Sequence, residues 1–533
     1  MNRFFSPLHA AIWIILLATA AALRLWQLPG QLLADDEWHA IHKLMGSGPG
    51  EIFQSFGHAD HTIPLTLFYQ LLAQTVGLTE WVMRAPMLIA GVATVLLLPW
   101  LLGSRAFRDE KIVFGALLAV APLLVYFSRT ARPYALSVVL AVTAIFAFRW
   151  WWLQTGHRWA IVYVACTAIA AWLHPLTLAV TGVGFLFHAP GALLAATKAS
   201  DWSGIRRLTG LGVITLLALA ALLGPPIVGD FQSLATKAGA DQISPTTVWA
   251  ALQLFSGSGN PLWTSGWILL TIWGGAMLVY RDPATGAYLL TIILIASALI
   301  AATGGAWIHH PLVLARYLLP VLPIMLFLSA IPLAAAIRTL PTPAKAAAPF
   351  AVVLMAYLAG PLPGQYHQWP NQFTGHMAYQ FDYDTQRNVY NQQLARDFIP
   401  DFYQDLSAYP ARSITLIKAP WYMEWHWNPW HLYQAVHKQS VVAGMISGLC
   451  LDHAFGEIPP SESGIRMMNK VHLNQPAQAR EKADFLVVRH SPPRSDARPI
   501  PDWDDCRQSI DDKYGPPIRA TDDKSVYSLS EVL

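Results

Sequence analysis

The sequence predicts a polytopic α-helical membrane protein that ends in a smaller α/β region. Of the 533 residues, 54% are hydrophobic and only 13% are charged, a balance that excludes an ordinary water-soluble domain. Apolar runs of about 20 residues, the length that a helix needs to cross a bilayer, recur up to residue 360. No such run follows. We therefore expect a transmembrane domain in residues 1–360 and a soluble α/β domain in residues 361–533.

The C-terminal region alternates between helix and strand patterns. The run RNVYNQQLARDFIPDFYQDL, residues 387–406, has helical spacing, whereas SITLIKAP (413–420) and ADFLVVRH (483–490) are typical of buried strands. Cys450 and Cys506 both lie in this region, and an oxidising exterior would allow them to pair. These patterns predict a small α/β domain.

Net charge and cysteine content exclude other classes of protein. The formal net charge is only +3 at pH 7, which does not indicate a nucleic-acid partner. Three cysteines are too few for a disulfide scaffold or a zinc module. His309 and His310 are adjacent, but no third ligand lies near them in the sequence. We expect neither a metal nor another cofactor.

Basic residues in short loops predict the orientation, because such loops stay on the cytoplasmic side. They indicate about eleven spans, with the N-terminus inside and the C-terminus outside. The first apolar run follows a basic start, so a cleaved signal peptide is the alternative; we interpret it as an uncleaved helix. The predicted spans are 8–26, 81–102, 112–128, 134–153, 159–173, 176–196, 208–227, 263–280, 285–302, 316–337 and 346–360.

One apolar stretch, HTIPLTLFYQLLAQTVG at 61–77, is short for a span. Counting it as a span would place the basic loop 105–111 outside. We expect instead a helix that lies in the outer interface, within a first external loop at about 27–80.

Three consecutive acids, Asp35, Asp36 and Glu37, begin this loop directly after the first span. Ionised groups at this position do not help insertion and are costly inside the hydrocarbon. Acids also cap interfacial helices, so a purely structural role is the alternative.

Arg129, Arg132 and Arg316 also lie on the outer side, against the positive-inside pattern. Each could extend its guanidinium to lipid headgroups. Because the three share one side of the membrane with the acids, they favour an anionic ligand.

Several motifs together carry a family resemblance. They are the Asp36-Glu37 pair, the run from Asp60 through IPLTLFYQLL, FSRTARPYAL (127–136), WLHPLTLAV (172–180) and ARYLLPVLPIMLFLSA (315–330). In this order and spacing, the chain resembles the polytopic GT-C glycosyltransferases. It is most similar to the protein-mannosyltransferase-like group that includes the lipid A aminoarabinose transferases. The chain departs from that group at Thr62, where a basic residue is usual, and at Ile63-Pro64, where two prolines are usual.

The resemblance implies transfer of a monosaccharide from a polyprenyl-phosphate donor to an acceptor hydroxyl, on a lipid, glycan or protein, at the outer face of the plasma (inner) membrane. The acceptor hydroxyl loses its proton as it attacks, which calls for a carboxylate within hydrogen-bond reach. Asp36 is the first candidate for this base and Asp35 the second. Glu37 is expected to orient the acceptor or to bond an outer-loop arginine.

The leaving group is a lipid phosphate, whose growing charge is best met by guanidinium groups. Arg132 and Arg316 are the first candidates for this contact, and Arg129 is the third. His61 and His58 substitute for the basic residue that Thr62 replaces. Further candidates for the site are Asp60, His174, Tyr134 and Tyr317, although a lone histidine such as His174 more often makes a structural hydrogen bond.

Two other functions stay open at this point. An oligosaccharide ligase or polymerase with a diphosphate-linked donor needs the same outer-face acids and arginines. A lipid or sugar transporter is the second alternative, but transporters place charges near the bilayer midplane and show repeated, broken helices. Here the charges gather outside.

Overall fold

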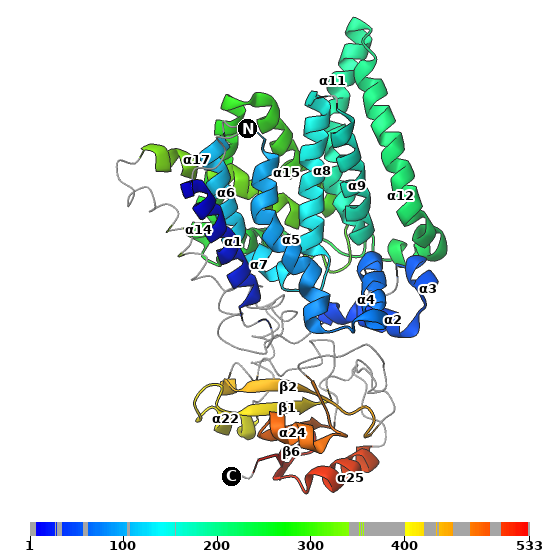
Figure 1. Ribbon diagram of the computed structural model, residues 1–533, viewed down its shortest axis with the longest axis vertical. Helices are drawn as coiled ribbons and strands as arrows, with labels where there is room; N and C mark the ends of the chain where they lie inside the picture. Colours follow the sequence, from blue (N-terminus) through cyan, green and yellow to red (C-terminus); the bar gives the residue numbers. More distant parts are fainter. Residues whose placement is uncertain are drawn as a thin grey trace.

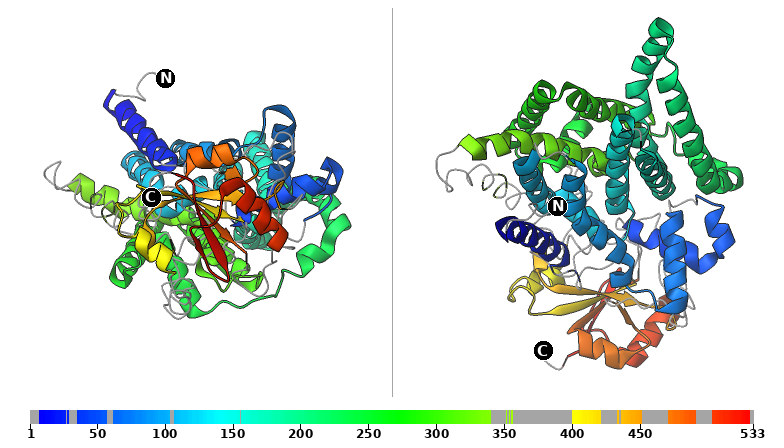
Figure 2. Two further views of the ribbon diagram at one scale, coloured as in Figure 1. Left: turned by 90° about the horizontal axis from the view of Figure 1, so that it is seen from below. Right: turned by 45° about the horizontal axis from the view of Figure 1, so that its top comes forward.

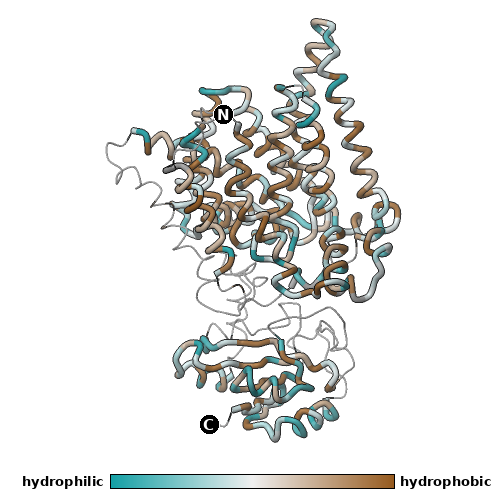
Figure 3. The backbone as a smooth tube through the Cα atoms, viewed as in Figure 1, coloured by the Kyte–Doolittle hydropathy of each residue, from teal (hydrophilic) through white to brown (hydrophobic). Residues whose placement is uncertain are grey.

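The computed structural model describes residues 7–26, 28, 35–56, 62–103, 107–154, 156–339, 351, 353, 355, 400–420, 433, 436–450, 470–490 and 503–530. A bundle of helices forms the larger part, and a six-stranded sheet lies beyond one end of it (Figure 1). The helices of the bundle are mostly hydrophobic along their length, whereas the sheet region mixes hydrophobic strands with hydrophilic helices and turns (Figure 3). The prediction of a helical region followed by an α/β region is confirmed.

Helices occupy each predicted span from 8–26 to 316–337. Among the described residues, seven helices are long and apolar enough to cross a membrane, or eight if the bent pair α6–α7 is one span. The predicted span 346–360 lies outside the described residues except at 351, 353 and 355, which are helical. The long elements are α5 (Glu80–Leu101), α8 (Tyr134–Gln154), η4–α10–α11 (Pro175–Ala199), α12 (Ser203–Ala235), α14 (Pro261–Arg281), α15 (Pro283–Ala302) and η5–α17 (Leu319–Thr339).

Two further predicted spans are occupied by shorter apolar helices, α1 (Pro7–Leu25) and α9 (His157–Leu173). The bent pair consists of α6 (Arg108–Val120) and α7 (Pro122–Ser128), which meet at 57°. Pro122 explains this break, because proline lacks the N–H that an uninterrupted helix would use there.

Short elements cover the end of the bundle nearest the sheet (Figure 1). They are η2 (Asp35–Trp38), α2 (His39–Gly46), α3 (Pro49–Phe53) and α4 (Ile63–Thr75), with α13 (Pro245–Ser256) and α16 (Pro311–Tyr317). Helix α4 has 13 residues, too few to span, and it packs against α2 and α9. The Tyr69 hydroxyl ties α4 to α5 by donating to the Met83 carbonyl at 2.8 Å.

The sheet has the strand order β3-β2-β1-β4-β6-β5. Strands β1 to β4 are parallel, and β6 and β5 complete the sheet in antiparallel pairs. The predicted strands 413–420 and 483–490 are β1 and β4, central neighbours buried on both faces, which explains their continuous apolar runs. The strands are β1 (Thr415–Ala419), β2 (Ser440–Met445), β3 (Lys470–His472), β4 (Phe485–Arg489), β5 (Arg519–Ala520) and β6 (Lys524–Ser528).

Helices cover both faces of the sheet, as the view from below shows (Figure 2). Helices α24 (Pro476–Lys482) and α25 (Trp503–Tyr514) pack on the face that carries Ile417 and Leu486. Helix α22 (Asp401–Leu406), the described end of the predicted helix 387–406, packs on the opposite face. Residues of β2 also contact the helical bundle around Ile41 of α2, so the sheet region lies against the same end of the bundle as α2.

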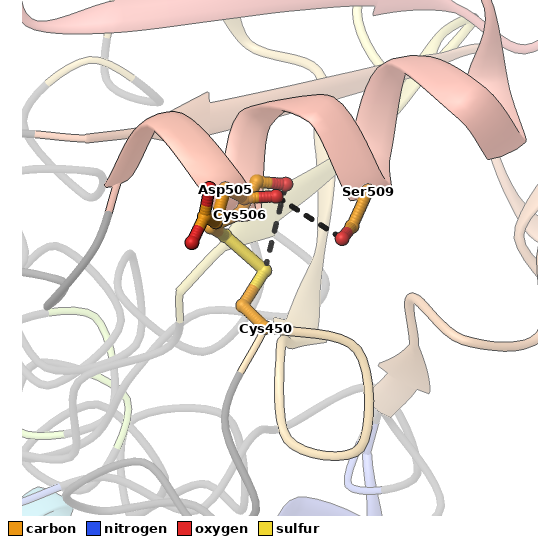
Figure 4. The surroundings of a disulfide bond; sticks show 4 residues. All are labelled: Cys450, Asp505, Cys506 and Ser509. Atoms are coloured by element: carbon orange, nitrogen blue, oxygen red, sulfur yellow. Dashed lines mark hydrogen bonds between the residues drawn. A yellow bond between two sulfur atoms is a disulfide. The ribbon is translucent and has the colours of Figure 1, made fainter.

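Cys450 and Cys506 form a disulfide, with their Cα atoms 4.7 Å apart (Figure 4). The bond joins the turn that follows β2 to the first turn of α25. The pairing that the sequence allowed is therefore present.

Candidate active site

The structure brings three of the predicted site residues together at the end of the bundle. Asp36 comes from η2, Arg132 from the junction between α7 and α8, and Arg316 from the last turn of α16. Nη1 of Arg316 donates to Oδ2 of Asp36 at 2.6 Å, across 280 residues of sequence. Nε of Arg132 lies 3.9 Å from the same oxygen, and its Nη1 donates to the Asp36 carbonyl at 3.4 Å. One carboxylate thus faces two guanidinium groups.

The charges of this cluster are mutually stabilised. Burial raises the pKa of the Asp36 carboxyl, but the charges of Arg316 and Arg132 outweigh burial and hold that pKa well below its ordinary value. Burial would lower the pKa of the Arg316 guanidinium, yet Tyr134 and Asp36 keep it well above its ordinary value. The Asp36 carboxyl and the Arg316 guanidinium are therefore both ionised at physiological pH.

The two arginines line a cavity of about 230 Å³. Tyr134, His174 and Tyr317, all predicted as site candidates, line it too. The Arg316 guanidinium carbon lies 5.6 Å from the ring centre of Tyr134 and 5.3 Å from that of Tyr317, within the range of cation–π attraction. The ring of His174 lies 5.3 Å from the ring of Tyr317. Tyr134 and Tyr317 thus flank Arg316, and His174 packs against both tyrosine rings.

Glu37 is buried beneath the cluster rather than directed into the cavity. Arg84 of α5, also fully buried, donates to it through Nε at 3.0 Å and Nη2 at 3.1 Å. The backbone N–H of Ala131 donates to the same carboxylate at 2.7 Å. The expectation that Glu37 orients the acceptor or bonds an outer-loop arginine is replaced by this buried contact. Glu37 fastens η2 to α5 and to the residue before Arg132, and so it positions both sides of the Asp36–Arg132 contact.

Sequence reasoning missed Arg84, although its signal was visible. It is a single arginine inside an apolar span, and such charges pair with another polar group in the bundle.

The described hydrogen bonds of Arg129 go to the end of α1, and its assignment as a phosphate candidate stays a prediction. Its Nη1 donates to the carbonyls of Leu23, Arg24 and Trp26 at 3.2, 3.1 and 2.7 Å. The last carbonyls of a helix have no partner within the helix, so a buried guanidinium there satisfies them. Arg129 therefore holds the end of α1 in place.

The side chains of four predicted candidates lie outside the part of the chain that the structure describes. His58, Asp60 and His61 lie outside the described residues. The backbone of Asp35 belongs to η2, and its side chain lies outside the described part.

Lys237 also lines the cavity and was not predicted. It follows the end of α12, where backbone hydrogen bonds tie this segment to the loop after α15: Ala306 N–H to the Lys237 carbonyl at 3.0 Å and Gly239 N–H to the Thr303 carbonyl at 2.9 Å. The available signal was a basic residue on the outer side, the same signal that singled out the arginines.

The neighbouring residues His309 and His310 have different surroundings. The ring of His309 contacts the carboxylate of Asp241, whereas His310 is buried. Within the described ranges, no group of three or more His, Cys, Asp or Glu side chains has the geometry to hold a metal ion.

No protein-family model matches this chain, and no curated protein matches it. Among solved structures, it is similar to ArnT from Cupriavidus metallidurans in the apo state, with 13% identity, a TM-score of 0.48 and 98% of each chain covered. The same protein bound to undecaprenyl phosphate matches with 12% identity and a TM-score of 0.45, covering 97% of this chain and 98% of that one. ArnT is an aminoarabinose transferase, of the group that the motifs resemble.

A third similar structure is the archaeal oligosaccharyltransferase AglB from Archaeoglobus fulgidus, in complex with an inhibitory peptide and a dolichol-phosphate. It shares 13% identity at a TM-score of 0.42, over 90% of this chain and 69% of that one. At these values none of the likenesses carries the function, which we derive from the residues of the chain itself.

Proposed function

We propose that this chain is a membrane glycosyltransferase of the GT-C type. It would move a monosaccharide from a polyprenyl-phosphate-linked donor to an acceptor hydroxyl at the outer face of the membrane. The observation that carries the proposal is the contact between Asp36, Arg132 and Arg316 beside a cavity of about 230 Å³. A base and a pair of phosphate-binding groups are the parts that such a transfer needs.

The donor phosphate binds between Arg132 and Arg316. Their planar guanidinium groups donate in pairs to phosphate oxygens, and the aromatic rings around Arg316 limit its other orientations. Because these arginines sit at an end of the helical bundle, a phosphate can reach them while its prenyl chain stays among the helices. An apolar cavity of about 590 Å³, lined by residues of α9 to α12 such as Phe185, Leu208 and Leu216, is the place that we propose for this chain.

The bound phosphate also activates the base. In the structure the Asp36 carboxylate is neutralised by Arg316, and its depressed pKa makes it a poor proton acceptor. A phosphate that takes over the Arg316 hydrogen bond removes this stabilisation, so the pKa of Asp36 rises toward its ordinary value. The acceptor oxygen then bonds to the anomeric carbon as the bond from that carbon to the phosphate oxygen breaks. The acceptor proton passes to Asp36, and the bond electrons stay on the lipid phosphate, whose added negative charge is stabilised by the two arginines.

We propose that residues 1–360 form the transmembrane domain and that residues 361–533 lie outside the cytoplasm. The Cys450–Cys506 disulfide supports this orientation, because such bonds persist in oxidising compartments. The sheet region that carries it packs near the same end of the bundle as Asp36. With the proposed topology, the site would lie in the outer interface of an inner membrane.

A defined-donor assay tests the function. The purified protein in lipid nanodiscs is given polyprenyl-phosphate sugars with a radiolabelled sugar, and an envelope extract supplies acceptors. We expect label in an acceptor fraction from the monophosphate donor and none from the matched diphosphate donor. Transfer only from the diphosphate would assign the ligase or polymerase function instead. Movement of intact donor across the membrane without transfer would assign a transporter.

A further inference from the structure

The sheet region carries a second cluster of cations, far from the helical site in sequence. Lys418 is the penultimate residue of β1, Arg489 is the last residue of β4, and Lys524 is the first residue of the antiparallel β6. Lys418 pairs with Val487, and Arg489 pairs directly with Lys524. Because side chains alternate along a strand, the three cations lie on one face of the sheet at one edge.

This edge is where an open α/β sheet binds its ligands. From β1 the chain continues to β2 and β3 on one side, whereas β4 lies on the other side of β1. The strand order therefore reverses between β1 and β4, and the carboxyl ends of these two strands form a topological switch point. Lys418 and Arg489 occupy those carboxyl ends.

The same sheet face is apolar away from the edge. Leu416, Phe485, Val487 and Val526 pack there against α22. The cations begin only where the strands end, so they are not an ordinary solvated surface. Lys418 is 1% exposed and Lys524 is 9% exposed.

Two tyrosine rings form the wall of this cluster. The Lys418 ammonium lies 3.7 Å from the ring centre of Tyr403 and 5.3 Å from that of Tyr433, and the two rings stack at 4.6 Å. With Arg489 and Lys524, they line a cavity of about 10 Å³. That volume holds about one atom the size of a water oxygen.

The electrostatics of the cluster favour an added anion. Like charges directly opposite on neighbouring strands repel each other, and burial adds a desolvation cost. Asp523 lies at the rim, 2.7 Å from Lys524 Nζ and 3.9 Å from Arg489 Nη2. Nε of Arg489 is buried and has no acceptor among the described residues. Burial, together with the charges of Lys524 and Arg489, holds the pKa of Lys418 well below its ordinary value.

We propose that this edge is a second binding site, for a compact oxyanion such as a phosphate monoester. One anion oxygen enters the cavity that Lys418, Tyr403 and Tyr433 line together. The remaining oxygens face Arg489 and Lys524, which line the same cavity. The site is independent of the glycosyltransferase site and does not rest on that function.

Equilibrium binding of radiolabelled inorganic phosphate to the full-length protein in detergent tests the site. All measurements use the Arg316→Gln background, which weakens the helical cation cluster. We expect about one phosphate per chain in this background and loss of that binding on adding Lys418→Met, which keeps the packing on Tyr403 but removes the charge. Lys513→Gln, an exposed lysine on α25, is the matched control and should keep the binding.

Two results would overturn the proposal. One is the absence of phosphate binding in the Arg316→Gln background, and the other is equal binding with and without Lys418→Met. Lys524→Gln, nearer the rim, repeats the comparison if the Met variant fails to fold. Nanodiscs containing phosphatidic acid identify the source of the oxyanion. Lys418-dependent competition with labelled phosphate supports the site with a lipid headgroup as its ligand, and binding without such competition supports it with a free oxyanion.

Discussion

The two cation clusters of this protein are built in different ways. In the helical region, Arg132 and Arg316 come from distant segments and close on Asp36, so the carboxylate is inside the cluster. In the sheet region, Lys418, Arg489 and Lys524 are placed by strand register, and Asp523 lies only at the rim. Guanidinium groups around an exchangeable carboxylate suit a reaction in which charge moves. Two ammonium groups and a guanidinium group fixed on three neighbouring strands suit a bound anion that stays unchanged.

The largest expected effect separates a chemical role for Asp36 from a structural one. Asp36→Asn keeps the shape of the side chain but removes its ability to accept a proton. Transfer should fall by about a hundredfold or more, the usual range for a general base. Polyprenyl-phosphate binding, measured in parallel, should not weaken, because the Asp36 carboxylate no longer competes with the phosphate for Arg316.

The capping alternative predicts the opposite result. Asp36→Asn should stay active, because Asn caps a helix as well as Asp does. Asp35→Asn is the matched control on the neighbouring residue. An active Asp36→Asn with an inactive Asp35→Asn would shift the base by one position, and activity in both would leave the acids structural.

The next effect concerns the phosphate. Arg132→Ala and Arg316→Ala should each weaken polyprenyl-phosphate binding by roughly tenfold to a hundredfold, since hydrogen bonds to charged groups contribute about 1.5–3 kcal/mol. Lysine at either position should restore only part of the affinity, because it lacks the planar fork. Arg129→Ala should leave affinity unchanged and lower the thermal unfolding midpoint, since Arg129 holds α1. Unchanged affinity in both Arg132→Ala and Arg316→Ala would show that the donor phosphate does not bind at this site.

A smaller effect on transfer should follow from the buried Glu37–Arg84 pair. Glu37→Gln leaves the Arg84 charge without its counter-charge, so the unfolding midpoint should fall and transfer should drop by about tenfold as Asp36 and Arg132 lose their support. Glu37→Gln with Arg84→Met should be more stable than Glu37→Gln alone, because no unpaired charge stays buried. Additive losses in this pair would contradict the contact.

The smallest effect is in the pH dependence of stability. The pKa of Asp36 in the folded protein lies well below its ordinary value of about 4, so the Asp36 ion pairs stabilise the fold above about pH 4 and lose this contribution only as the pH falls further. The difference in unfolding midpoint between the native protein and Asp36→Asn should therefore be constant from pH 8 to 5 and shrink below pH 4. A difference that shrinks between pH 7 and 5 would show that the carboxyl pKa is not depressed.

The sequence by itself determined the apolar helices of this fold and its two central strands, because their signals are local. Apolar runs of membrane-spanning length mark the helices, and the short run at 61–77 was separated from them by its length and by the orientation of the basic loop 105–111. Continuous apolar runs likewise marked β1 and β4. The sequence also indicated Asp36, Arg132 and Arg316, because charges at membrane boundaries stand out against an apolar chain.

Only the tertiary structure decided which of these charges meet. Arg129 and Arg132 are three residues apart and looked equivalent in sequence, yet one holds the end of α1 and the other faces Asp36. Asp36 and Glu37 are neighbours, yet one lies beside the cavity and the other is buried on Arg84. The cations at the edge of β1 and β4 became a cluster only through strand order. Partner choice depends on helix packing and register across hundreds of residues, and no local pattern encodes it.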